Sequence, residues 1–474
     1  MSSRPLEGIR VVDLSRVFAM PYCGAYLADL GAEVIKIDTH HSQFVDTTRT
    51  LNGPYPDNQP GEEYWEQAGT FHSLNRGKLS LSLDLRSDAA LEVLKNLVAV
   101  SDVVLENFTP RVMRRFGLDY PSLKSHRPDL IMASNTGYGH SGPWSNFGAM
   151  ATALEPTHGG GAFMGYLELD AQGRLRPGSV PNKIANSYTD FLASWTAQLA
   201  VLASLYHRAK TGQGTWIDLA MYQVGVSFIG EGLLDFGFNQ RRDRRLGNRH
   251  EFLSPHGCYP CQGKDEWVVI AVRDDVEWRA FCQALDLPGL SDHARFYDPM
   301  VRYQNQDELD ALISDWTSSR STFDVMALLQ NAGVPCGAAL NAKQLLADPH
   351  LRNRGYFESV DHPAESGLGR REYVSRGWKL SLAEVGIRKP APRLGEDNDY
   401  VLSQVLGLSR PDIDQLYRSN AVGQTLQGAQ TPTVVPLEEQ AELGWIANYD
   451  PEYRQFLSDV VNPDVINPER QPGP

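Results

Sequence analysis

Asp190 is the residue whose surroundings best suit a catalytic role. It lies in the segment NSYTDFLAS, directly before a long apolar pattern typical of a helix. Asp is among the best N-cap residues. A helix N-terminus also favours the charged carboxylate and lowers its pKa, and a carboxylate can attack an activated acyl group. The residues alone leave both a structural cap and a nucleophile open, just as Gly159, Gly160 and Gly161 suit either a close backbone approach or a surface turn.

The pair CYPC, Cys258 and Cys261, is the other spacing that could carry chemistry. No second C-x-x-C and no H-x(3–5)-H lies near it, and it does not open a helix after a strand. We therefore expect neither a metal nor a redox site. Four histidines are interpreted as solvated or structural residues: His40, His41, His250 and His256.

Several motifs of common enzymes are missing from the sequence. It has no G-x-S-x-G, no P-loop and no H-E-x-x-H. The turn after the first predicted strand, LSRVFAMP, contains no glycine. A dinucleotide-binding fingerprint requires glycines there, so a nicotinamide dehydrogenase of the usual type is disfavoured.

The N-terminal half alternates predicted strands and helices. A short β-rich run at Ile9–Leu14, a helix at Pro21–Leu30 and a strand at Glu33–Ile37 make a βαβ unit, with Gly31 at the helix C-terminus. Further elements are strands at Asp102–Glu106 and Leu130–Ser134 and helices at 88–99 and 110–116. This alternation predicts an α/β fold with a doubly wound, Rossmann-like parallel sheet.

A long helix follows Asp190. Apolar residues recur along it at steps of three and four, namely Phe191, Trp195, Leu199, Leu202 and Tyr206. Other apolar residues lie between them, so we expect most of this helix to be buried. It ends at the turn TGQG, and a strand is predicted at Thr215–Leu219.

Composition shifts along the chain divide it into five predicted parts. They are a large α/β domain (1–222), a linker (223–244), a small domain (245–341), a segment of helices and short strands (342–423) and a tail (424–474). The tail holds seven prolines, too many for regular structure. Its aromatic residues suggest that it docks on a surface.

The overall composition is that of a globular protein with an acidic balance. The 474 residues include 44 Lys+Arg and 58 Asp+Glu, a formal net charge of −14. This charge argues against nucleic-acid and anionic-membrane partners. Five scattered cysteines, no apparent signal peptide and no apolar run of membrane-spanning length indicate a cytoplasmic protein.

Several ordered stretches together resemble the class III coenzyme A transferases, the formyl-CoA transferase-like family, over about residues 6–420. The stretches are LEGIRVVDLSRVFAMPYCGAYLADLGAEVIKID (6–38), SLNRGKLSLSLDL (73–85), SDVVLENFTPRVMRRFGLDY (101–120), SNTGYGHSGP (134–143), RAKTGQGTWIDLAMYQ (208–223), GNRHEFLSPHGCYPC (247–261) and GEDNDYVLSQVLGL (395–408). The place of CYPC in this family is an ordinary strand.

The resemblance implies an acyl-CoA:carboxylate CoA-transferase. Asp190 would be its nucleophile, passing through a mixed anhydride and an aspartyl-CoA thioester, with the CoA thioester as substrate and no tightly bound cofactor. It also implies that residues 342–423 return to the large domain, that the small domain is α+β, and that the protein is a homodimer of interlocked rings. By the same resemblance the CoA contacts fall on Val17, Phe18, Leu74, Asn75, Lys78, Asn107, Phe108, Val112 and Arg115, and Tyr138 lines the reaction site.

The chain departs from the family pattern in ways that keep two alternatives open. Thr39 stands where an Arg usually contacts CoA, and EFLS (251–254) replaces a glycine-rich loop. An α-methylacyl-CoA racemase would need a His where Ala149 lies, although His140 and His158 are nearby candidates. A CoA-binding paralogue without catalysis is the other alternative.

Overall fold

The computed structural model describes residues 4–51, 53–166, 172, 187–241 and 245–461. The chain forms two compact units. The larger comprises Met1–Gly160, Ile184–Glu231 and Pro349–Pro474, and the smaller comprises Gly161–Lys183 and Gly232–Asp348. The five parts predicted from the sequence divide the chain in a different way from these two units, and their limits stay a prediction.

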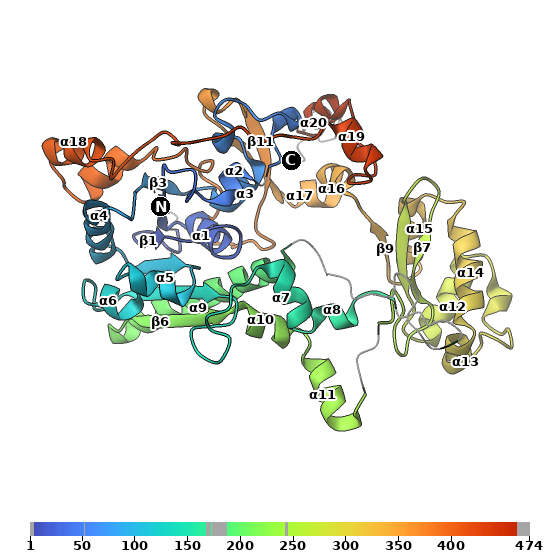
Figure 1. The fold of residues 1–474 in the computed structure, drawn as a ribbon. Helices are drawn as coiled ribbons and strands as arrows, with labels where there is room; N and C mark the ends of the chain where they lie inside the picture. Colours follow the sequence, from blue (N-terminus) through green and yellow to red (C-terminus); the bar gives the residue numbers. More distant parts are fainter. Residues whose placement is uncertain (1–3, 52, 167–171, 173–186, 242–244, 462–474) are drawn as a thin grey trace. The chain divides into compact units, whose positions relative to one another are not determined.

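The larger unit is built on a six-stranded parallel sheet of order β3-β2-β1-β4-β5-β6 (Figure 1). This is the strand order of a doubly wound sheet, and it confirms the predicted Rossmann-like α/β fold. The strands are β1 (Arg10–Asp13), β2 (Glu33–Asp38), β3 (Leu79–Ser82), β4 (Val103–Glu106), β5 (Ile131–Thr136) and β6 (Thr215–Ala220). A separate antiparallel hairpin pairs β10 (Phe357–Asp361) with β11 (Arg370–Val374).

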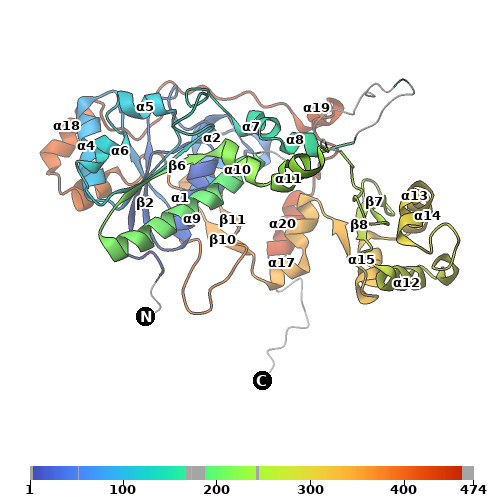
Figure 2. The same cartoon turned by 90° about the horizontal axis from the view of Figure 1, so that it is seen from below.

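Helices cover both faces of this sheet (Figure 2). The helices of the larger unit are α1 (Ala19–Asp29), α2 (Thr47–Thr50), α3 (Gly69–Asn75), α4 (Asp88–Ala99), α5 (Pro110–Arg115), α6 (Tyr120–Lys124), α7 (Ala151–Thr157), α9 (Tyr188–Thr211), α10 (Met221–Ser227), α17 (Pro349–Asn353), α18 (Arg410–Arg418), α19 (Leu437–Glu442) and α20 (Tyr453–Val461). Two helices, α8 (Gly160–Phe163) and α11 (Gly230–Asn239), span the points where the chain passes between the units.

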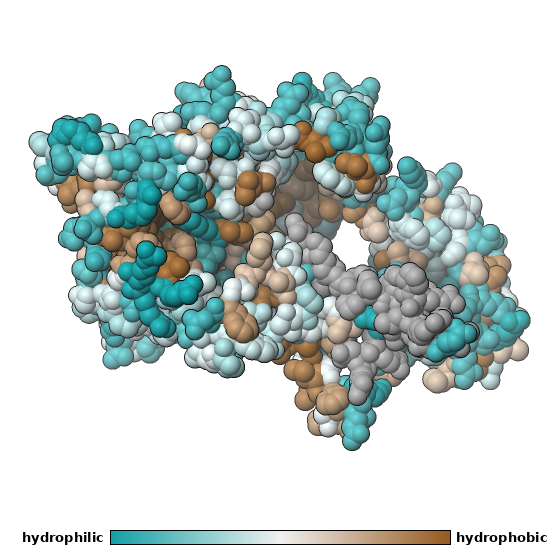
Figure 3. Space-filling view, in the orientation of Figure 1, coloured by the Kyte–Doolittle hydropathy of each residue, from teal (hydrophilic) through white to brown (hydrophobic). Residues whose placement is uncertain are grey.

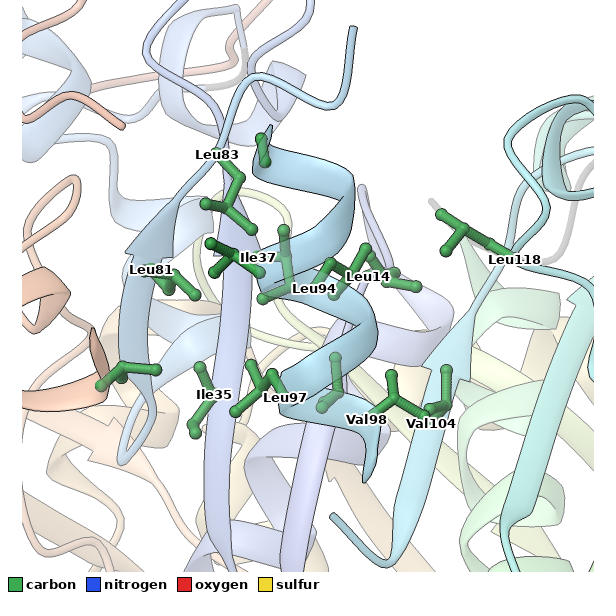
Figure 4. Close-up of a cluster of buried hydrophobic side chains, with 14 of the residues drawn as sticks. Leu14, Ile35, Ile37, Leu81, Leu83, Leu94, Leu97, Val98, Val104 and Leu118 are labelled. Carbon is green, nitrogen blue, oxygen red and sulfur yellow. The ribbon is translucent and has the colours of Figure 1, made fainter. Parts of the chain in front are cut away.

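The alternation of side chains along each strand supplies two hydrophobic cores. In β1, Val12 packs in the core that includes α4, whereas Val11 packs in the core that includes α1 and α9. Figure 4 shows Leu94, Leu97 and Val98 of α4 against the strand side chains. Continuous apolar runs in the strands are what a parallel sheet covered on both faces requires.

The smaller unit has an antiparallel sheet of order β7-β8-β9, formed by β7 (His256–Pro260), β8 (Trp267–Ala271) and β9 (Cys336–Ala339). Its helices are α12 (Asp275–Ala284), α13 (Pro299–Gln304), α14 (Gln306–Thr317), α15 (Thr322–Asn331) and α16 (Ala342–Ala347). Cys258 lies within β7, and Cys261 directly follows it. The expected strand at CYPC is therefore confirmed.

The prediction that the tail, residues 424–474, lacks regular structure is wrong. The tail contains α19 and α20, and the proline Pro436 occupies the N-cap of α19, where its missing N–H costs nothing. Asn58 donates to the carbonyl of Val435 at 2.9 Å, and both Tyr453 and Arg454 bind Asp57. Within the described residues, this part of the chain packs on the segment around 57–58.

The expectation that α9 is mostly buried is also wrong. Leu192, Ala193 and Val201 are buried, whereas Trp195, Leu199 and Tyr206 are 48%, 70% and 68% exposed. The four- and three-residue steps identify a helix correctly, but Trp195, Leu199 and Tyr206 do not face the core of their own chain. Among the described residues, no helix is both long and apolar enough to cross a membrane.

Candidate active site

Asp190 lies in the first turn of α9, three residues after the N-cap. The N-cap is Ser187, which has a left-handed φ of 61°, and the helix begins at Tyr188. The prediction that Asp190 itself is the N-cap is therefore wrong. The pattern S-x-x-D, from Ser187 to Asp190, is a capping-box signal that could have located the start correctly.

A cavity of about 220 Å³ opens beside Asp190. It brings together the first turns after β1, β4 and β5 with the starts of α7, α9 and α10, as expected at the carboxyl ends of parallel strands. Its lining consists of Val17, Asn107, Phe108, Thr109, Pro110, Asn135, Thr136, Gly137, Ser145, Phe147, Ala149, Met150, Ala151, Thr152, Ser187, Asp190 and Met221.

The pKa of Asp190 is shifted in the direction opposite to the one expected from the sequence. Burial and the nearby carboxylate of Glu155 raise the pKa of Asp190 to about 7, although hydrogen bonds from the Ala19 backbone N–H and the Ser187 side chain favour its charged form. The predicted lowering by the helix N-terminus is thus wrong in direction. A helix N-terminus contributes only about 0.3–1 kcal/mol to a carboxylate, which is less than burial costs it here.

The turn between β1 and α1 forms one wall of this cavity and is held tightly. Asn107 accepts from the Arg16 N–H at 2.9 Å and donates to the Arg16 carbonyl at 2.7 Å. The N–H of Val17 donates to the carboxylate of Asp46. Val17 has a φ of 69°, which is rare for a β-branched residue. These bonds fix a strained turn without glycine at the edge of the cavity.

A second cavity, of about 300 Å³, adjoins the first at Phe108, which lines both. Its lining is mostly apolar, and the charged residues in it are Arg16, Arg86, Asp38 and Asp84. The Arg16 guanidinium lies 5.2 Å from the centre of the Phe108 ring. The N–H of Phe108 donates to Glu106 at 2.8 Å, and burial raises the pKa of Glu106 to about 7.

The comparisons with known proteins identify the family of this chain. Residues 6–398 match the family model described as CoA-transferase family III. The chain belongs to CoA-transferase family III. It is therefore an enzyme that transfers CoA, and the family predicted from the sequence motifs is confirmed.

Curated relatives carry the names of CoA-transferases. The chain is 30% identical over 409 residues to a succinate–glutarate CoA-transferase of Agrobacterium fabrum, covering 86% of this chain and 97% of the relative. It is 32% identical over 365 residues to a succinyl-CoA:mesaconate CoA-transferase of Haloarcula marismortui, covering 76% and 86%. A crystal structure of a CaiB/BaiF family protein from Brucella suis superposes with a TM-score of 0.74 at 28% identity, covering 85% of this chain and all of that one.

Four of the CoA contacts implied by the family resemblance line the two cavities. Val17 and Asn107 line the cavity beside Asp190, Val112 lines the second cavity and Phe108 lines both. Phe18 lies next to Val17 and packs edge-on against Phe191 of α9, with ring centres 6.3 Å apart. Their contact with CoA stays a prediction.

The other predicted contacts lie outside the linings of these two cavities. Leu74 is buried against Tyr22 and Tyr26, and the amide of Asn75 accepts from Lys78. Lys78 is fully buried in an ion pair with Asp13, at 2.6 Å. Arg115 is exposed at the end of α5, and Tyr138 packs edge-on against Phe147, which does line the Asp190 cavity.

The two histidines that could serve a racemase are held by other groups. His158 Nδ1 accepts from the Gly160 N–H at 3.2 Å, so its Nε2 donates to Thr189 at 3.1 Å, and burial lowers the pKa of His158. His140 Nδ1 lies 3.1 Å from Asp218. Neither is among the residues that line the Asp190 cavity, which favours CoA transfer over proton exchange.

Proposed function

We propose that this enzyme moves CoA from an acyl-CoA to a carboxylic acid, with Asp190 as the covalent nucleophile. The observation that carries the proposal is the half-buried carboxylate of Asp190 in the lining of a cavity that adjoins a second, mostly apolar cavity whose lining includes Arg16 and Arg86. The second cavity suits the nucleotide end of CoA, because phosphates require cations. The thioester would then lie near Phe108, within reach of Asp190.

The reaction proceeds through four balanced steps. A carboxylate oxygen of Asp190 attacks the thioester carbon, the C–S bond breaks, and the CoA thiolate leaves with the negative charge. The thiolate then attacks the Asp190 carbonyl carbon of the mixed anhydride and expels the donor carboxylate. The acceptor carboxylate next attacks the aspartyl thioester, and the released thiolate finally attacks the acceptor acyl group. The Asp190 carboxylate is thereby restored.

Exclusion of water decides whether the thioester energy is retained. Apolar side chains, including Phe108, Phe147 and Met150, contribute to the cavity wall around Asp190. The reaction requires no metal and no cofactor besides the CoA thioester. The names of the relatives make succinyl-CoA the first donor to test, with small dicarboxylic acids as acceptors.

The test is to trap the intermediate. The enzyme is incubated with succinyl-CoA, quenched with hydroxylamine, digested and examined by mass spectrometry. We expect an Asp190 hydroxamate and loss of activity, together with a loss of turnover of about 1000-fold or more in Asp190→Ala. A trapped adduct on another residue, or full turnover in Asp190→Ala, would contradict the proposal.

We also propose a homodimer. The exposed stripe of α9 includes Trp195, Leu199 and Tyr206, and α11 exposes Leu233, Leu234, Phe236 and Phe238. Figure 3 shows apolar side chains gathered on the α11 segment. Exposed apolar surface on this scale is typical of a surface that a partner covers. Light scattering at micromolar concentration should give twice the chain mass of 52.7 kDa, and Leu199→Lys should weaken the dimer.

A further inference from the structure

Glu155 is a fully buried carboxylate directly behind the start of α9. Its Oε1 accepts from the Tyr188 N–H at 3.0 Å, and its Oε2 has no hydrogen-bond partner among the described residues. Ala151, one turn earlier on the same face of α7, lines the Asp190 cavity. The carboxylate of Glu155 therefore lies just behind the wall of the cavity in which Asp190 reacts.

No cation is among the described residues that shift the pKa of Asp190. From α7 and its C-cap, Glu155 and His158 pack against the start of α9: Glu155 accepts from the Tyr188 N–H, and His158 bonds to Thr189. The bond from the Gly160 N–H to Nδ1 keeps His158 neutral. The titratable residue of α10 is Tyr222. Those of α1 are Tyr22, Cys23, Tyr26 and Asp29. Asp29 is bound by Arg76 and Arg376.

The arrangement is costly for the fold. A buried carboxylate without a cation beside it is destabilising, and two such groups near each other repel. Glutamine at position 155 would accept the same Tyr188 N–H without carrying a charge. The choice of a charged residue here therefore requires a reason other than the support of α9.

We propose that Glu155 is a positioning residue whose negative charge makes Asp190 a stronger nucleophile and favours its acylated states. This inference rests on the proposed function of Asp190. When the Asp190 oxygen bonds to the acyl carbon and the C–S bond breaks, the negative charge leaves with the thiolate. The repulsion between the two carboxylates ends at that moment, so the neighbouring charge disfavours free Asp190 relative to both the anhydride and the aspartyl thioester.

The decisive variant is Glu155→Gln, which keeps the acceptor for Tyr188 and removes the charge. The readout is kcat/KM for succinyl-CoA against pH, whose rise reports ionisation of Asp190 in the free enzyme. We expect the midpoint to fall by about one pH unit and the rate at pH 8 to fall about 10-fold. Glu92→Gln, an exposed residue of α4 that loses the same charge far from the site, should leave the midpoint unchanged.

Glu155→Asp and Glu155→Ala keep the inference testable should the Gln variant fail to fold. Asp retains the charge but is too short to keep the bond to Tyr188. The inference requires its midpoint to stay above that of the Ala variant. Equal midpoints in these two variants, or an unchanged midpoint in Glu155→Gln, would overturn it.

Trapping with hydroxylamine separates this inference from the proposed function. An Asp190 adduct in the wild-type enzyme, with no shift in Glu155→Gln, would refute only the role of Glu155. The absence of that adduct in the wild-type enzyme would refute the proposed function itself. An adduct that accumulates less in Glu155→Gln than in the wild-type enzyme would support both.

Discussion

Asp13 and Asp190 are two carboxylates at the carboxyl-end side of the same sheet, and the fold treats them in opposite ways. Asp13, at the end of β1, is fully buried and is paired with Lys78 at 2.6 Å. Asp190 lies at the cavity with Glu155 as its charged neighbour. The lysine neutralises Asp13, whereas no cation is among the described residues that shift the pKa of Asp190, which fits the role proposed for Asp190.

The same contrast extends around the turn after β1. Lys36 pairs with Asp46 at 3.1 Å, and Arg49 pairs with Asp38 at 2.9 Å, and all four side chains are at most 1% exposed. Asp46 in turn accepts the N–H of the strained Val17. Buried pairs therefore hold the turn that forms one wall of the site.

The largest effect should come from breaking a buried pair. Lys78→Met leaves the Asp13 carboxylate buried without its cation and should lower the free energy of unfolding by about 3–5 kcal/mol. Urea unfolding at a fixed protein concentration measures this loss. The double variant Lys78→Met/Asp13→Asn removes both charges and should recover most of it. A double variant no more stable than Lys78→Met would show that packing of the Lys78 side chain matters more than its charge.

Removal of the unpaired charge should have the opposite sign. The pKa of Asp190 is raised to about 7 in the folded protein, against an ordinary value of about 3.9. The folded state therefore holds this proton more tightly, and stability falls as the pH rises from about 4 to 7. Asp190→Asn avoids this loss, so it should match the wild-type protein near pH 4 and exceed its stability by about 1–3 kcal/mol at pH 8.

Thermal or urea unfolding at several pH values checks this prediction. Asp315→Asn, which removes an exposed carboxylate from α14 in the smaller unit, serves as the control for the loss of one charge. A stability difference between Asp190→Asn and the wild-type protein that does not change with pH would contradict the raised pKa.

Much of the fold could be predicted because it depends on patterns local in sequence. Val11 and Val12 are consecutive apolar residues that point to opposite faces of the sheet, as a sheet covered on both faces requires. Gly31 marks the end of α1. The stripe of α9 shows where such reasoning stops. Periodicity identified the helix, but Leu199 could be assigned to the core only by assuming that its apolar face packs within its own chain.

The sequence could single out Asp190 as a candidate residue, and its role as nucleophile stays a prediction, whereas its environment could not be predicted. Asp190 stood out because an Asp precedes a long apolar helix and because the motifs resemble a known family. Glu155, by contrast, lies 35 residues earlier in a segment without a recognisable motif. Its effect on Asp190 arises from the packing of α7 against α9, and no local pattern encodes that contact. The raised pKa was missed for the same reason.

The smallest effect on stability should come from Arg86. Its pair with Asp84, at 2.8 Å, resembles the Lys78–Asp13 pair in chemistry, but the Arg86 side chain is 54% exposed. Water stabilises the two separated charges almost as well as their mutual attraction does. Arg86→Ala should therefore leave the unfolding midpoint unchanged. Because Arg86 lines the second cavity, the same variant should raise the KM for acyl-CoA about 3- to 10-fold with kcat unchanged. Arg111→Ala, an exposed residue of α5 outside both cavity linings, is the matched control. An equal KM in the two variants would contradict a role of the second cavity in binding CoA. The pair of Arg86 and Asp84 would then have no part in binding.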